Sequence, residues 1–199
     1  MTPNVSVAGV SMTKFGKFLN SSIKQLVNEA VDNVLSDAGL ERSSVDAIFF
    51  GNCVQGHMEG QDMIRGEVAL RPLGFEKLPI FNVENACATA STAFHLACNY
   101  VNSDAADIVL AIGAEKMISK DKDLMFRAFD GAWDVHNAES SKTTFETMSP
   151  ILSLGSDSNS VKRHSVFMEV YAGWCRKHME VFGTTRKQLA AVASKNHKN

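Results

Sequence analysis

Residues 81–91 read FNVENACATAS, and this stretch determines the fold that we predict. The apolar end of a strand gives way to polar Glu84 and Asn85, and a run of small residues then begins at Cys87. The order strand, sharp turn and helix is a common way to present a nucleophile above a parallel sheet. Backbone N–H groups and the helix dipole at such a helix start stabilise a thiolate. Cys87 is therefore a candidate nucleophile.

The residues alone leave a second interpretation of Cys87 open. Free cysteine is among the residue types most often buried, so a structural thiol in the core is the alternative. Activation of a cysteine also requires a base, which the spacing of the sequence does not place.

Short apolar runs alternate with helical spacing of apolar residues on both sides of this stretch. We predict four strands, at residues 5–10, 45–50, 78–83 and 107–112. Helices are predicted between them, at residues 22–39, 61–70 and 88–101. The last strand is apolar almost throughout, which is typical of a strand covered on both faces in a parallel sheet. The sequence thus predicts an α/β fold, a layered parallel-type sheet with flanking helices and an inserted loop domain.

The pattern changes after residue 117, so we predict an α/β core at 1–117 and a second domain at 118–199. Residues 119–160 are polar with weak periodicity, which is typical of functional or mobile segments. We expect short helices and loops there, lying over the sheet. Helical spacing returns at residues 166–182, and Thr185 with Gln188 begins a last helix with a capping-box pattern.

Composition and charge exclude several classes of protein. Of the 199 residues, 45% are apolar and 21% are charged, which is ordinary for a globular chain. The net charge of −2 offers no basic excess for phosphates, so we expect no nucleic-acid partner. The longest apolar run, Ile108–Ala114, is shorter than the roughly 20 residues of a membrane span. The four cysteines lack metal-binding spacing, so we expect no metal, free thiols and a cytoplasmic location.

The segment around Cys87 resembles the nucleophile region of the thiolase superfamily. It is similar in particular to the sterol-carrier-protein-type thiolases and acetyl-CoA acetyltransferases, whose pattern reads approximately Asn-x-x-Cys-Ala-(Ser/Thr)-Gly-Ser. Further segments agree in the family's order, namely MTKFG at 12–16, GNCVQG at 51–56, AIGAEKM at 111–117 and YAG through HMEVFG at 171–183. Of the chain from residue 5 onward, residues 119–160 lack a clear counterpart.

The resemblance implies an acyl-CoA acyltransferase of the thiolase type. In that family the cysteine that matches Cys87 attacks an acyl-CoA thioester and becomes acylated, and the acyl group then undergoes Claisen condensation or the reverse thiolysis. The implied substrate is a coenzyme A thioester, with no permanently bound cofactor. Asn85, Ala90 and Tyr171 are the expected residues of the acyl pocket, whereas residues that contact CoA are not assigned. The family usually has glycine where this chain has Ala90, whose methyl group either crowds the turn or the substrate or favours the helix.

The departures from the family concern a second half. Family members continue for about as long again, and that half supplies the activating histidine of a Gly-His-Pro motif, an oxyanion-hole loop and a second cysteine in a Cys-x-Gly motif. None of these motifs occurs here, nor does the strand that closes the first half. We therefore expect a thiolase first half that is truncated before its last strand, is inactive alone and exposes apolar surface.

Four explanations of this truncation remain open. The chain is a fragment, one subunit of a split thiolase, a degenerate relative that binds CoA esters or serves as a scaffold, or a CoA-thioester retro-aldolase subunit with a zinc- and OB-domain partner. A homodimer, or a hetero-oligomer with a C-terminal half, is the expected assembly. In a eukaryote the location would be peroxisomal or mitochondrial instead of cytoplasmic.

Three further residues have polar or reactive side chains. Cys53 follows the second predicted strand, near the edge where sites of parallel sheets form. We predict that it serves packing or an interface. His57 and Glu59 have the chemistry of an acid–base pair, but we predict a solvated loop.

Overall fold

The computed structural model describes residues 5–132, 134–137, 139–140, 143 and 166–198. It divides into two compact units, Met1–Ala128 and Phe129–Asn199. The structural division thus falls later than the predicted one after residue 117, and the assignment of the second part as a loop domain remains a prediction. The helices and strands of the first unit are α1 (Ile23–Ala38), β1 (Ala47–Gly51), α2 (Gln55–Glu59), α3 (Arg65–Leu70), β2 (Ile80–Val83), α4 (Thr89–Asn102) and β3 (Val109–Gly113).

A parallel sheet lies at the centre of the first unit. Its three strands follow the order β2-β1-β3, with β1 in the middle. Gly51 at the end of β1 lies opposite Val83 of β2 and Gly113 of β3, so the three strands end together. All five residues of β1 are buried. These features confirm the predicted α/β fold with a parallel sheet and flanking helices.

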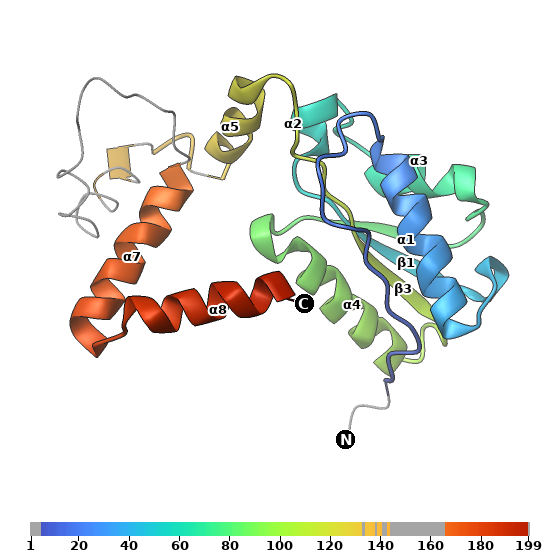
Figure 1. Cartoon of the computed structure of the whole chain (residues 1–199). Helices are drawn as coiled ribbons and strands as arrows, with labels where there is room; N and C mark the ends of the chain where they lie inside the picture. The colour runs from blue at the N-terminus through green and yellow to red at the C-terminus, as the bar shows by residue number, and fades with distance from the viewer. Residues whose placement is uncertain (1–4, 133, 138, 141–142, 144–165, 199) are drawn as a thin grey trace. The chain divides into compact units, whose positions relative to one another are not determined.

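The two faces of the sheet are covered by different helices (Figure 1). Ile48 and Phe50 of β1 belong to a core shared with α1 and α3. Phe49, between them, belongs to a second core with Ala93 and Ala97 of α4. Successive side chains of a strand point to opposite faces, so β1 requires an apolar layer on each side.

Helix α1 begins and ends at the residues that the sequence predicts. The Ser22 N–H donates to Gln25 Oε1 at 2.8 Å, and the Gln25 N–H donates to Ser22 Oγ at 3.3 Å. This reciprocal pair is a capping box. Gly39 ends the helix with φ of 65°, a left-handed conformation that glycine adopts without steric cost.

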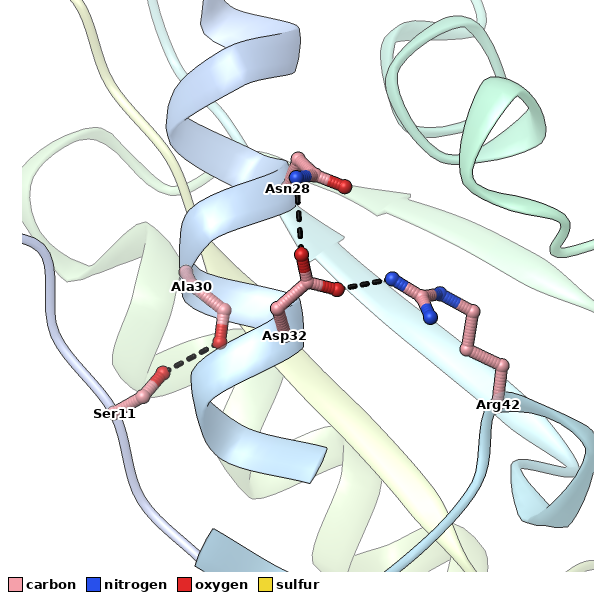
Figure 2. A network of polar contacts seen from close by, with 5 residues as sticks. All are labelled: Ser11, Asn28, Ala30, Asp32 and Arg42. Carbon is pink, nitrogen blue, oxygen red and sulfur yellow. Dashed lines mark hydrogen bonds and ion pairs between the residues drawn. The ribbon is translucent and has the colours of Figure 1, made fainter. Parts of the chain in front are cut away.

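Residues 5–10 do not form the predicted first strand, and the described part of the chain forms a sheet of three strands rather than four. A strand requires a hydrogen-bonded neighbour, whereas this segment is bonded to α1. The Val10 N–H donates to Asp37 Oδ2 at 2.8 Å, and the Ser11 hydroxyl donates to the Ala30 carbonyl at 2.7 Å. Figure 2 shows Ser11 on one side of α1. On the other side, Asp32 of the same helix pairs with Arg42.

Two differences from prediction concern residues 55–70. Helix α2 occupies the place of the predicted solvated loop, and its His57 Nε2 lies 3.1 Å from the Leu124 carbonyl oxygen. The helix predicted at 61–70 is shorter in the structure. Helix α3 starts only at Arg65, because Ile64 before it has a left-handed conformation.

Beyond β3 the structure describes three long helical segments. Helix α5 (Lys122–Asp130) lies in the predicted polar region, most of whose remaining residues are outside the described part of the chain. Helix α7 (Val166–Phe182) and helix α8 (Arg186–Lys198) confirm the predicted returning helices. Thr185 and Gln188 form the predicted capping box, in which the Thr185 N–H donates to Gln188 Oε1 at 2.7 Å.

Candidate functional site

Three chain segments meet at the carboxyl edge of the sheet, because the parallel strands end in register. Residues 52–54 follow β1, residues 84–88 follow β2, and residues 114–115 follow β3. In open α/β sheets, ligands bind outside the carboxyl ends of the strands. The candidate site therefore lies at this edge.

Cys87 lies in the turn between β2 and α4. It is exposed and occupies the middle of a short 3-10 helix, Ala86–Ala88, that leads into α4. The residue before α4, Ala88, provides no side-chain cap for the helix. The 3-10 helix runs directly into α4, since the Ala88 N–H donates to the Asn85 carbonyl at 2.9 Å and the Thr89 N–H donates to the Ala86 carbonyl. The helix dipole favours negative charge at this end.

A left-handed residue shapes the turn that presents Cys87. Ala86 has φ of 45°, a conformation that costs a non-glycine residue about 1–2 kcal/mol. Hydrogen bonds offset that cost. The Ala86 N–H donates to Glu84 Oε1 at 2.6 Å, and the buried Thr89 hydroxyl donates to the Ala86 carbonyl at 2.7 Å. The Asn85 N–H donates to Thr89 Oγ1 at 2.9 Å.

The predicted pocket residues are found in two different parts of the molecule. Asn85 is exposed, and its side-chain Nδ2 donates to Thr92 Oγ1 at 2.9 Å. Ala90 lies in the first turn of α4, with its methyl group towards Gly113 at the end of β3. Tyr171 lies on α7 in the second unit, in edge-to-face contact with Trp174 at a centroid separation of 5.1 Å. Their contact with an acyl group stays a prediction.

The loop after β1 is fixed by two charged residues from distant segments. The Glu115 carboxylate accepts the Cys53 N–H at 2.8 Å and the Val54 N–H at 3.1 Å. Arg65 Nη1 donates to the carbonyl oxygens of Asn52 and Cys53 at 2.9 and 3.0 Å. Arg65 and Glu115 thereby hold the main chain around Cys53 in one position.

Glu84 connects the Cys53 thiol to the turn that contains Cys87. Its Sγ donates to Glu84 Oε1 at 3.3 Å. Burial raises the pKa of the Cys53 thiol to about 11, together with this hydrogen bond and the negative charges of Glu84 and Glu115, while Arg65 acts in the opposite direction. The thiol is therefore neutral near pH 7, and its packing or interface role stays a prediction.

Sequence reasoning did not assign roles to Glu84, Arg65 and Glu115. Glu84 and Glu115 each follow a strand that ends at the site edge. Their position after a strand could have marked them as candidate site residues. Arg65 gave no such signal, because its contact with Asn52 and Cys53 depends on how α3 packs. Within the described ranges, no cluster of three or more His, Cys, Asp or Glu residues has an arrangement for a metal ion.

The parallel sheet and the cysteine in the turn after β2 agree with the resemblance to the thiolase family. A family model described as "Thiolase, N-terminal domain" matches residues 5–199, and the chain belongs to that family.

Among proteins of known name, an acetyl-CoA acetyltransferase from Methanothermobacter thermautotrophicus is 32% identical over 98% of this chain and 45% of its own length. Sterol carrier protein 2 from Gallus gallus is 32% identical over 99% of this chain and 33% of its own length. A solved 3-oxoacyl-[acyl-carrier-protein] synthase III from Aquifex aeolicus VF5 aligns over 56% of this chain and 35% of its own, with 20% identity and a TM-score of 0.46. The chain thus spans less than half the length of the relatives named here. None of the helices that the structure describes has the length and apolar character of a membrane span.

The contact between Ala90 and Gly113 gives a prediction for stability. A Cβ atom on Gly113 would lie 2.6 Å from the Ala90 Cβ, well inside van der Waals contact. We expect Gly113→Ala to lower the free energy of unfolding by about 1–3 kcal/mol, as measured by urea denaturation. Adding Ala90→Gly removes the clash, so the double variant should lose less than the sum of the two single losses.

Gly131→Ala is the matched control, because a Cβ on Gly131 meets no atom within 4 Å. It should change the free energy of unfolding by less than about 0.5 kcal/mol. Additive losses for Gly113→Ala and Ala90→Gly would show that the two residues do not touch.

Proposed function

We propose that this chain is the N-terminal half of a thiolase-type acyl-CoA acyltransferase, with Cys87 as the residue that accepts the acyl group. The observation that carries the proposal is the position of Cys87, exposed in the turn between the end of β2 and the start of α4. The family match and the relative named acetyl-CoA acetyltransferase support the same chemistry.

The proposed reaction has two steps around the sulfur of Cys87. The thiolate attacks the carbonyl carbon of an acyl-CoA, the carbon–sulfur bond to CoA breaks, and CoA leaves as a thiolate that takes up a proton. The acyl group then passes from Cys87 to the carbanion of a second acyl-CoA, and the Cys87 thiolate is released. The covalent intermediate divides one difficult step into two easier ones. Backbone N–H groups at the start of α4 provide positive potential for the developing oxyanion.

The reaction also needs a base for the Cys87 thiol. Among the described residues, no histidine is hydrogen-bonded to that thiol. We propose that the base comes from a C-terminal half, either in the same longer protein or in a partner chain. The share of each relative that this chain covers, 45% and 33%, leaves room for such a half.

A groove beside β3 supports the need for further chain. It has a volume of about 650 Å³ and lies between residues 5–11 on one side and residues 107–113 on the other, with α1 and α4 as its walls. β3 is an edge of the described sheet. A parallel sheet that ends at an apolar groove is open to the addition of another strand. We propose that the closing strand, supplied by the rest of the protein or by a partner, occupies this groove.

A non-catalytic subunit that binds CoA esters or serves as a scaffold is the second candidate. It is favoured by the absence of a base from the described contacts of Cys87. It differs from the first proposal in one respect that can be measured: a binding subunit retains CoA-ester affinity when Cys87 is replaced, and its wild type transfers no acyl group.

Replacement of Cys87 tests the catalytic proposal. In the assembly that joins this chain to its C-terminal half, we expect Cys87→Ala to reduce acyl transfer from acetyl-CoA by a factor on the order of 10³ or more, because the covalent acceptor is lost. Release of CoA thiol is the measurement. Cys98→Ala, at a half-buried thiol of α4, is the control and should retain activity within about twofold. Undiminished transfer by Cys87→Ala would rule out this residue as the acceptor.

The groove predicts how the isolated chain behaves. We expect the 199-residue chain alone to associate or aggregate in light-scattering experiments, because the groove and exposed apolar residues such as Val7 and Val10 have no cover. Co-expression with a C-terminal half should yield a defined complex with a higher melting temperature. A stable, monodisperse monomer of the isolated chain would contradict this expectation.

A further inference from the structure

Glu84 contacts both thiol-bearing segments of the site through a single oxygen atom. Its Oε1 accepts the Ala86 N–H at 2.6 Å, one residue before Cys87. The same oxygen accepts the Cys53 thiol at 3.3 Å. Glu84 thus joins the loop after β1 to the turn after β2.

The first of these contacts acts on the backbone that presents Cys87. Ala86 is held in the left-handed region, where a residue with a side chain is strained. Thr89 holds the carbonyl side of Ala86, and Glu84 holds its N–H side. Without an acceptor on Glu84, the turn loses one of the two side chains that hold Ala86, and Cys87 loses its fixed position.

The second contact acts on the charge state of Cys53. The charged groups that face this thiol are Glu84, Glu115 and Arg65. The two carboxylates disfavour a thiolate and Arg65 favours it, so removal of the Glu84 charge lowers the pKa of the Cys53 thiol. Arg65 and Glu115 also fix the main chain of the loop, so the sulfur stays beside Glu84.

We propose that Glu84 is a positioning residue for both thiols, holding the turn of Cys87 in its left-handed form and binding the Cys53 thiol by a hydrogen bond, so that Cys87 rather than Cys53 reacts with electrophiles. This inference deepens the proposed function of Cys87 and rests on it for its biological meaning. A reactive thiolate at Cys53, beside the turn of Cys87, would compete for the acyl group. The contacts of Glu84 remove that competition while they orient the acceptor.

Alkylation with iodoacetamide of the assembly that joins this chain to its C-terminal half tests the proposal. Each thiolate displaces iodide and forms a thioether, and peptide mass spectrometry reports the rates at Cys53 and Cys87 separately. Since no acyl-CoA takes part, failure of the acyl-transfer proposal and failure of this one are distinguishable. At pH 8 we expect Cys53 in the wild type to react at least about tenfold more slowly than Cys87.

Two substitutions of Glu84 separate its two roles. Glu84→Gln keeps an acceptor for the Ala86 N–H but removes the charge, so the Cys53 rate at pH 8 should rise about threefold while the Cys87 rate stays within about twofold. Glu84→Leu also removes the acceptor, so the Cys87 rate should change by about tenfold as well. Glu76→Gln, an exposed carboxylate paired with Arg71 at 3.9 Å, is the control and should leave both rates unchanged.

Circular dichroism and thermal melting establish that each variant is folded. An unchanged Cys53 rate in Glu84→Gln overturns the proposal, and so does an unchanged Cys87 rate in folded Glu84→Leu. If Glu84→Leu does not fold, Glu84→Gln decides alone, because it keeps the hydrogen bond to Ala86 and the pH profile of Cys53 responds only to the lost charge.

Discussion

The burial of β1 on both faces is the constraint on which the rest of the structure depends. A strand that is covered above and below has no face for water, so it needs α1 and α3 on one side and α4 on the other. It also needs a strand on each edge, and β2 and β3 supply them in parallel. Parallel pairing in register then ends all three strands at one edge, where Glu84, Cys87 and Glu115 follow them in the chain.

At that edge, hydrogen bonds from charged side chains hold the main chain of the loops that follow the strands. Arg65 and Glu115 bond the main chain of the loop after β1, and Glu84 bonds the turn after β2. These contacts fix backbone atoms rather than a ligand, so the loops that form the site are held in place. An exposed thiol at a helix start beside such fixed loops is suited to covalent chemistry. The described contacts of Cys87 include no base, and the proposed enzyme therefore requires a second half.

The sequence allowed the sheet, the capped helices and the Cys87 turn to be predicted, because each depends on local pattern. Ser22 with Gln25 marks a helix start by chemistry alone. The strand at residues 5–10 was wrong because alternating residues do not show whether a neighbouring strand is present. Ala86 in a left-handed conformation and the contact between Ala90 and Gly113 were not predictable either. They depend on how α4 docks against β3, which spacing along the chain does not encode.

The measurement that tests the account most directly is the location of the acetyl group after incubation of the assembly with isotopically labelled acetyl-CoA and a rapid acid quench. Peptide mass spectrometry then reads which residue carries the label. The account predicts one acetyl group as a thioester on Cys87, sensitive to hydroxylamine, and none on Cys53, whose thiol is held neutral by burial and by Glu84. Label on Cys53, or on no cysteine at all, would contradict the claim that the turn between β2 and α4 presents the nucleophile.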